Sequence, residues 1–531
     1  MTNSDLLANS VKHVSFGIIL QICLRIATFV VNACILRVIS REVLGIINVR
    51  LTLLYSSIQF ISREAFRRAA ISDSKSHNWS NTVNVIWLNV PVSIIVGSFF
   101  SAIWIYCLHK PDPQLVSGYD SASVIIPISV LVEIIAEPAY IFGQLNSFLK
   151  LRIIIEGLAI LLKCTLMIIL TTKYPDNAVS VYAYSQLVSS IFYTLIYYTY
   201  FYIYFNGTIT FTETFAPKIN NLWNSLNSDL VVLVYSFFKQ TVVKQLLTEG
   251  EKLVMTFFNP LTFAEQGIYE VINNLSSLPA RFIFQPIEES GYILFSQLID
   301  RNKPAKDQEK TNLISACNIL SVMLKLMITF GSIVVVFGYR FSDIVLLIYG
   351  GSKLSSDIAL TLMRCQCFYI LLIAINGVSE CFTFAAMNNT EISVFNKKMV
   401  RLSFIFLLST FVFTKMFGSP GFIFANCLNM TGRIFESAIF TRKYYANTSV
   451  KSPFSISLIP NVLVLLSLLA SFVFISIIEV FFPNIATVHF ITRLCVGFFF
   501  FAIVLLTFLL KEQSLVAFIM SEFRKRKNKK E

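Results

Sequence analysis

An apolar stretch that is rich in arginine holds the clearest candidates for chemistry in this sequence. The stretch runs from Ile35 to Ile71, and its segment from Leu51 to Ile61 is apolar enough to lie in lipid. A guanidinium near the bilayer centre costs about 2.5–3.5 kcal/mol, so such residues normally face a protein interior or a water-filled cavity. The stretch therefore predicts a cationic site within a membrane protein. Its charged residues are Arg37, Arg41, Arg50, Arg63, Arg67 and Arg68, with Glu42 and Glu64.

The spacing within this stretch favours an anion-binding face. Arg63 and Arg67 are four residues apart and share one face of a helix. Together with Arg37 and the neighbouring acid Glu64, they predict a site for an anionic ligand. An alternative stays open for arginines near helix ends, which can extend to the lipid headgroups and set topology. That alternative applies most directly to Arg41, Arg50 and Arg68.

Composition identifies the class of protein. The 531 residues are 55% hydrophobic and 14% charged, whereas a soluble protein has about 25% charged residues. The chain is therefore an integral membrane protein. Its formal net charge of +13 lies mainly in short loops and a basic tail, which indicates membrane topology and not nucleic-acid binding. The cysteines form no CxxC pair and the histidines are scattered, so we expect neither a metal site nor a cofactor.

Apolar runs of roughly 20 residues predict an all-α protein with about 14 membrane-spanning helices. If the N-terminus is cytosolic, the even-numbered loops carry most of the lysine and arginine, so we expect both termini in the cytosol. The expected spans are 14–39, 44–66, 83–108, 121–145, 151–172, 178–205, 229–258, 264–299, 312–338, 357–387, 392–416, 420–441, 456–482 and 487–511. The expected parts are an N-lobe (1–205), a cytosolic connector (206–228), a C-lobe (229–446), two additional helices (447–511) and a basic tail (512–531).

A second polar concentration lies between Leu247 and Glu289. Pro279 and Pro286 free backbone groups that a cavity or water must satisfy, and broken helices with polar side chains are how transporters build substrate sites. Gly250 and Gly267 permit a local break or a close backbone approach. The polar residues of this stretch are Glu249, Glu251, Lys252, Arg281, Gln285, Glu288 and Glu289.

Other charges within the spans are expected to form structural ion pairs. Glu133 and Glu137 lie four residues apart before Pro138, and Arg433 and Glu436 are spaced to neutralise each other. The chain has no Walker A, HExxH or GxSxG motif, so we expect neither ATP binding nor a catalytic nucleophile.

Three long motifs, NVRLTLLYSSIQFISREAFRRA, TEGEKLVMTFFN and QGIYEVINNLSSLPARFIFQPIEES, closely resemble signatures of the Rft protein family. This family belongs to the multidrug/oligosaccharidyl-lipid/polysaccharide (MOP) exporter superfamily. The resemblance implies two lobes of about six helices around a central cavity, with two extra C-terminal helices. It also implies movement of Man5GlcNAc2-diphosphate-dolichol from the cytosolic to the lumenal leaflet of the endoplasmic reticulum, for N-glycosylation.

Arginine suits such a diphosphate because a planar guanidinium binds phosphate oxygens through two parallel hydrogen bonds. We expect Glu251 and Arg281 to face the arginines from the opposite lobe. The expected partners are the dolichol-diphosphate oligosaccharide, membrane lipid and proteins of glycan assembly. The candidate substrate-binding residues are Arg25, Arg37, Arg63, Glu64, Arg67, Glu251, Arg281, Gln285 and Arg433.

Two other functions are open at this point. The chain could be a non-transporting accessory protein of dolichol-linked oligosaccharide assembly. It could also be a glycosyltransferase, but such enzymes generally need a sizeable lumenal domain, and the expected lumenal loops around Ser40 to Leu44 and Lys110 to Asp120 are short.

The C-terminal tail, FRKRKNKKE, places Lys527 and Lys529 at the fifth and third positions from the end. A cytosolic dilysine of this kind is a retrieval signal for the endoplasmic reticulum. The alternative is a polybasic segment that binds anionic lipid headgroups.

Overall fold

Helices make up the regular structure of the protein. A computed structural model describes residues 29–72, 79–114, 116–146, 148–206, 208–217, 228–301, 303–446, 458–481 and 487–513, with the single positions 26, 448, 450 and 453. Within this part of the chain there is no β-strand. The all-α prediction is thereby confirmed for the described residues.

Ten helices in the described residues are long and apolar enough to cross a membrane, or up to 11 if one bent pair counts as a span. The expected count of about 14 is therefore not confirmed and stays a prediction. The expected spans 264–299 and 420–441 contain helices that are not among these ten. The described part of the expected span 14–39 includes the shorter apolar helix Phe29–Val38.

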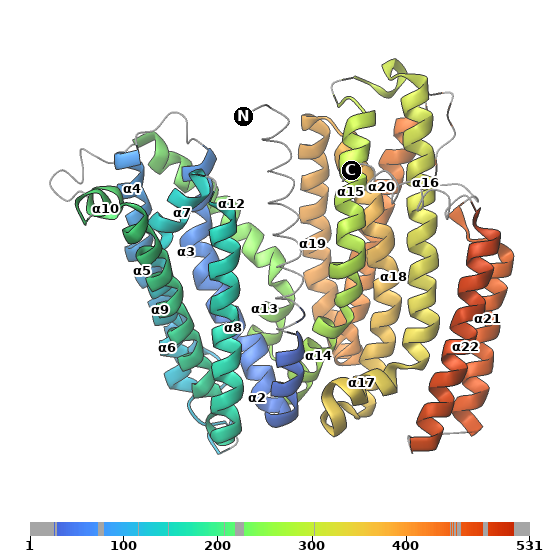
Figure 1. Ribbon diagram of the computed structural model, residues 1–531, viewed down its shortest axis with the longest axis horizontal. Coiled ribbons are helices and arrows are strands. Elements are labelled where there is room, and N and C mark those ends of the chain that lie inside the picture. Colours follow the sequence, from blue (N-terminus) through green and yellow to red (C-terminus); the bar gives the residue numbers. More distant parts are fainter. Residues whose placement is uncertain are drawn as a thin grey trace. The chain divides into compact units, whose positions relative to one another are not determined.

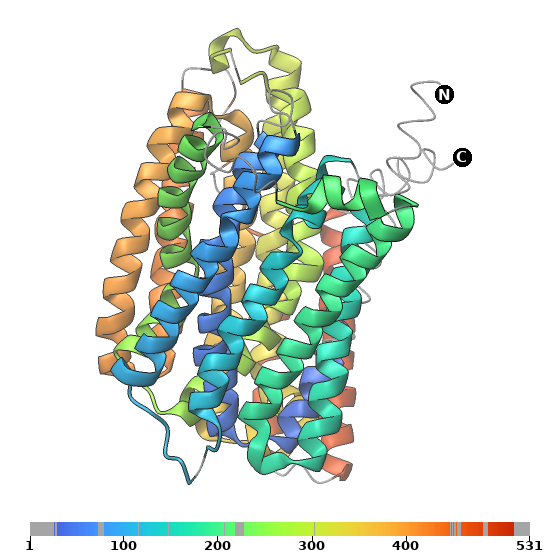
Figure 2. The ribbon, with the colours of Figure 1, turned by 90° about the vertical axis from the view of Figure 1, so that its left-hand side faces the viewer.

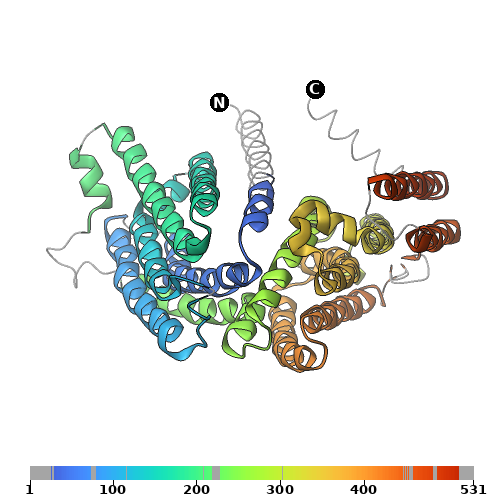
Figure 3. The same ribbon diagram turned by 90° about the horizontal axis from the view of Figure 1, so that it is seen from below.

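Contacts divide the chain into two compact units, residues 1–270 and 271–531. This division falls inside α14 (Phe263–Ser276) and differs in position from the expected connector at 206–228. The lobe boundaries themselves stay a prediction. Figure 1 shows the long helices of each unit running alongside one another, and Figure 3 shows them from their ends.

In the first unit, α3 packs against α5, α6 and α12, and α9 packs against α6 and α8. Figure 2 shows this unit from its side. α12 and α13, which the sequence places in the C-lobe, belong to this unit by their contacts. Its elements are α2 (Arg41–Gly45), the π-helical turn η1 (Ile46–Leu51), α3 (Thr52–Ser72), α4 (Trp79–Trp87), α5 (Asn89–Ala102), η2 (Ile103–Cys107), α6 (Tyr119–Ile135), α7 (Glu137–Leu145), α8 (Leu149–Lys173), η3 (Pro175–Asn177), α9 (Ala178–Tyr204), α10 (Thr208–Phe215), α12 (Ser228–Thr248), α13 (Gly250–Phe257) and the first part of α14 (Phe263–Ser276).

In the second unit, α18 packs against α15, α16 and α20, and α19 packs against α20. α21 and α22 pair with each other, and their buried residues Val464 and Val504 pack against Val336. The elements are η5 (Ala280–Phe284), α15 (Gln285–Leu298), η6 (Ala305–Asp307), α16 (Lys310–Ile333), η7 (Val334–Gly338), α17 (Ser342–Gly350), η8 (Gly351–Leu354), α18 (Asp357–Ala386), α19 (Asn389–Phe417), α20 (Pro420–Ala446), α21 (Val462–Phe481) and α22 (Thr487–Lys511).

Helix breaks occur where the sequence places proline, glycine and polar residues together. The expected span 121–145 is bent by 42° between α6 and α7, where Pro138 lies in the first turn of α7. Proline has no backbone N–H and its ring clashes with the carbonyl of the preceding turn, so the helix bends there. The expected span 229–258 breaks at Glu249, next to Gly250, and the π-helical turn η5 follows Pro279.

Two glycines let α2 and α14 approach at the backbone. A Cβ atom on Gly267 would lie 2.4 Å from the carbonyl oxygen of Arg41 and 2.8 Å from the nitrogen of Gly45. A Cβ atom on Gly45 would lie 1.9 Å from the carbonyl oxygen of Phe263. The close approach that the sequence suggests for Gly267 is therefore present, and both positions exclude any side chain.

Candidate functional site

The cationic face of α3 contains the predicted residues Arg63 and Arg67, and one buried acid lies beside them. Nε and Nη2 of Arg67 each donate to a different carboxylate oxygen of Glu137, both at 2.6 Å. The guanidinium carbon of Arg67 also lies 3.4 Å from the ring centroid of Tyr140, a cation–π contact. α7 carries both Glu137 and Tyr140, so the bend between α6 and α7 positions the partners of Arg67.

Arg63 is held less tightly than Arg67. Its Nε lies 3.8 Å from Oε1 of Glu137, beyond hydrogen-bond distance, and 22% of its side chain is exposed. Among the described residues, the ion pairs of Arg63 and Arg67 share this single carboxylate, which is 1% exposed. Two guanidiniums and one carboxylate carry a net positive charge, which suits an anion.

Glu64 is the acid that we expected in this cluster, but its carboxylate contacts other basic residues. Its Oε1 accepts a hydrogen bond from Nε of Arg68 at 2.8 Å and lies 3.7 Å from Nζ of Lys244 on α12. The sequence did not predict Glu137 as the acid for Arg67, because the two residues are 70 positions apart.

Glu133, on the other side of the bend from Glu137, is a buried carboxylate with neutral partners. Tyr55 and Gln59 donate to one of its oxygens at 2.7 and 2.6 Å, and Gln186 and Ser190 donate to the other at 3.1 and 2.7 Å. Its partners come from α3 and α9, so this carboxylate joins three helices of the first unit.

Arg50 is fully buried, which decides one of the alternatives left open by the sequence. Its Nη1 donates to the carbonyl oxygen of His109 at 2.7 Å and its Nη2 to Oδ1 of Asn259 at 3.5 Å. Extension of Arg50 to lipid headgroups is therefore wrong for this structure. Its guanidinium instead links η1 to the segments that follow η2 and α13.

Two other candidates, Glu251 on α13 and Arg37 on the helix Phe29–Val38, lie on other helices than Arg63 and Arg67. Oε2 of Glu251 accepts a hydrogen bond from the hydroxyl of Tyr269 at 2.8 Å, and Glu249 pairs with Lys252 at 3.1 Å. Arg37 is exposed on its helix. Arg25, Lys527 and Lys529 lie outside the described residues, and their roles stay predictions.

In the second unit, Arg433 on α20 makes a two-bonded ion pair with Glu380 on α18. Nε and Nη2 of Arg433 each donate to a different oxygen of Glu380 at 2.7 Å. Glu436 pairs instead with Lys398 at 2.6 Å. The expected pairing of Arg433 with Glu436 is thus wrong, because both side chains find partners on neighbouring helices.

A cavity of about 790 Å³ in the second unit is lined by residues of α15, α18 and α20. Glu380 is one of its lining residues, together with Glu288 and Glu289 of α15. Of the expected site residues nearby, Gln285 is exposed and donates to Glu289 at 3.0 Å, and Arg281 is exposed on η5. No group of three or more histidine, cysteine or acidic residues in the described part of the chain could hold a metal ion.

The fold has counterparts among solved structures. The lipid II flippase MurJ in an inward closed conformation matches with a TM-score of 0.60 at 13% identity, covering 92% of this chain and 97% of that one. An inward-facing multidrug resistance MATE family transporter of the MOP superfamily matches with a TM-score of 0.54 at 13% identity, covering 80% and 96%. The chain is therefore a multi-pass helical membrane protein with a MOP-type fold.

Sequence comparison gives the family. The model of the Rft protein family matches residues 9–522, and this chain belongs to that family. It is 38% identical over 481 residues to the Man(5)GlcNAc(2)-PP-dolichol translocation protein RFT1 of Xenopus tropicalis, covering 89% of this chain and 88% of the relative. It is 40% identical over 454 residues to the protein of the same name from Mus musculus, covering 84% of each.

Proposed function

We propose that this protein translocates Man5GlcNAc2-diphosphate-dolichol from the cytosolic to the lumenal leaflet of the endoplasmic reticulum membrane, for protein N-glycosylation. Family membership supports this function, since the relatives from frog and mouse are named as translocation proteins for this lipid. The headgroup is too polar to cross lipid unaided, so a protein must provide polar and cationic groups within the membrane.

One observation carries the proposal at the level of residues: Arg63 and Arg67 share one carboxylate, Glu137. A diphosphate would compete with Glu137 for these guanidiniums and would exchange an internal contact for a substrate contact. Such an exchange gives the ligand a different interaction energy in different states of the protein, which any alternating-access transport requires.

The test uses vesicles that contain only the purified protein and the dolichol-linked heptasaccharide. We expect the wild type to move the headgroup across the bilayer and Arg63→Ala to slow this movement about tenfold or more, because charge-assisted hydrogen bonds are lost. Arg63→Lys keeps the charge but loses the two-bonded geometry, so its rate should be intermediate.

Lys110→Ala is the matched control, because Lys110 forms an exposed ion pair with Asp120 at 2.8 Å and has no described contact with Arg63, Arg67 or Glu137. Its rate should equal that of the wild type. An Arg63→Ala protein that folds normally and transports at the wild-type rate would remove Arg63 from the substrate site. A wild-type protein without any transport in these vesicles would favour the accessory role in dolichol-linked oligosaccharide assembly.

A further inference from the structure

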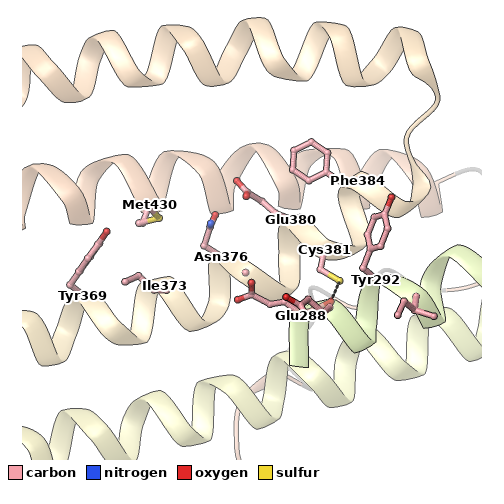
Figure 4. A pocket seen from close by; sticks show the side chains of 12 residues that line it. Glu288, Tyr292, Tyr369, Ile373, Asn376, Glu380, Cys381, Phe384 and Met430 are labelled. Carbon is pink, nitrogen blue, oxygen red and sulfur yellow. Dashed lines mark hydrogen bonds between the residues drawn. The ribbon is translucent and has the colours of Figure 1, made fainter. Parts of the chain in front are cut away.

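The cavity between α15, α18 and α20 combines hydrogen-bond acceptors with aromatic rings. Figure 4 shows Glu288, Asn376 and Glu380 in its middle part, with Tyr369 to one side and Tyr292 and Phe384 to the other. All of these residues belong to the second unit, so the cavity is a feature of that unit alone.

Among the described residues, this cavity holds more carboxylates than basic side chains that pair with them. Arg433 pairs with Glu380, whereas Glu288 has no basic group within 4 Å among the described residues. Gly377 makes room for Glu288: a Cβ atom there would lie 1.7 Å from Oε1 of Glu288. The carboxylate of Glu288 is thus accommodated against the backbone of α18 without an ion-pair partner in this part of the chain.

Asn376 supplies an independent sign of a ligand. Its side chain is 7% exposed, lines the cavity, and has an Oδ1 atom without a hydrogen-bond partner. A buried acceptor without a donor costs about 1–3 kcal/mol, so such groups are normally satisfied by a ligand, water or another residue. A ligand in the cavity that donates hydrogen bonds would satisfy this oxygen once the amide of Asn376 turns towards it.

We propose that this cavity binds sugar residues of the oligosaccharide headgroup. The inference rests on the proposed function and assigns the glycan part of the ligand to residues of the second unit. Sugar hydroxyl groups would donate to Glu288, Asn376 and Glu380, and the apolar faces of sugar rings would lie against the aromatic side chains.

The size and charge of the cavity favour the sugar residues of this glycolipid over its diphosphate. A volume of about 790 Å³ lies within the range of about 300–1,000 Å³ for small-molecule sites, whereas a single water takes up about 30 Å³ of liquid. The carboxylates of Glu288, Glu289 and Glu380 repel an anion, so the diphosphate is excluded from this cavity. The headgroup is thereby recognised by two chemistries: cationic for the diphosphate and acidic and aromatic for the glycan.

The experiment measures binding of free Man5GlcNAc2, without diphosphate or dolichol, to the purified full-length protein by isothermal titration calorimetry. We expect saturable binding to the wild type and an affinity at least about tenfold lower for Glu288→Gln and for Asn376→Ala. Gly377→Ala keeps every charged group but displaces the carboxylate of Glu288, and it should weaken binding as well.

Glu436→Gln is the matched control, since this acid on α20 pairs with Lys398 and does not line the cavity. It should bind the free glycan as the wild type does. Wild-type affinity in both Glu288→Gln and Asn376→Ala would overturn the inference. So would the absence of saturable glycan binding to the wild type.

The glycan-binding test can fail or succeed independently of the transport test of the proposed function. Suppose that glycan binding depends on Glu288 but the protein has no transport activity. That result would support sugar binding in the cavity and refute translocation. Suppose instead that Glu288→Gln and Asn376→Ala transport normally and bind the glycan with unchanged affinity. That result would support translocation and refute sugar binding in the cavity.

Discussion

Glu133 and Glu137 are one helical turn apart in sequence, and their partners differ in charge. Four neutral donors surround Glu133, whereas Glu137 lies between two guanidiniums. A buried carboxylate with a full set of neutral donors is already satisfied and has little to offer a ligand. Glu137 is different, because an incoming anion can replace it at Arg63 and Arg67. At the scale of residues, we therefore propose that Glu133 stabilises the fold, whereas Glu137 is the carboxylate that the substrate diphosphate replaces at Arg63 and Arg67.

Replacement of Glu137 by glutamine should lower stability strongly. The Arg67 side chain is 12% exposed and would lose its charged partner, and breaking a buried ion pair on one side typically costs about 3–5 kcal/mol. Thermal unfolding of the purified protein in detergent measures this loss. Glu156→Gln is the control, since it removes an exposed ion pair worth about 0–1 kcal/mol. Equal melting temperatures of the two variants would refute the structural importance of Glu137.

At the scale of elements, interruptions of the helices coincide with polar residues. The break after α6 separates Glu133 from Glu137, the break after α12 falls at Glu249, and η5 contains Arg281. A break frees backbone carbonyl and N–H groups that lipid cannot satisfy, so it is tolerated where protein or water lies nearby. The same places let polar side chains meet other helices, as Glu137 beside the first break meets Arg67 of α3.

Gly267→Ala should destabilise the packing of α2 on α14. A methyl group at this position would lie 2.4 Å from a carbonyl oxygen of the backbone, which cannot move away as a side chain can. Overpacking of this kind costs about 1–3 kcal/mol. Thermal unfolding measures the effect, with Gly143→Ala as the control because the nearest atom there lies at an ordinary 3.5 Å. A Gly267→Ala protein as stable as the control would contradict the close approach of α2 and α14.

At the scale of the whole molecule, the distribution of positive charge predicts topology. The even-numbered loops of the sequence carry most lysines and arginines, which predicts that both termini lie in the cytosol. Protease treatment of sealed microsomes should therefore remove an epitope placed at the C-terminus. A lumenal marker protein, intact in the same sample, controls for the seal of the membrane. Protection of the epitope would overturn the topology and exclude Lys527 and Lys529 as a cytosolic retrieval signal.

The sequence by itself determined the class of protein, the approximate positions of most helices and the family. These properties depend on local features: the length of apolar runs, the scarcity of charge, and motifs such as NVRLTLLYSSIQFISREAFRRA. The breaks near Gly250 and Pro279 were also expected, because glycine and proline act on the backbone within a few residues of themselves. The bend at Pro138 was not expected, and Pro127 lies inside α6 without a break. The anion-binding role of Arg63 and Arg67 was inferred from spacing alone and stays a prediction.

Only the tertiary structure decided which charges meet. Glu137 reaches Arg67 across 70 positions of sequence, and Glu380 reaches Arg433 across 53, in place of the neighbour Glu436. The burial of Arg50 and the unpaired acceptor of Asn376 likewise depend on other helices. The physical reason is that an ion pair within the membrane forms with whichever partner packing brings within about 4 Å, and packing joins helices that are distant in sequence.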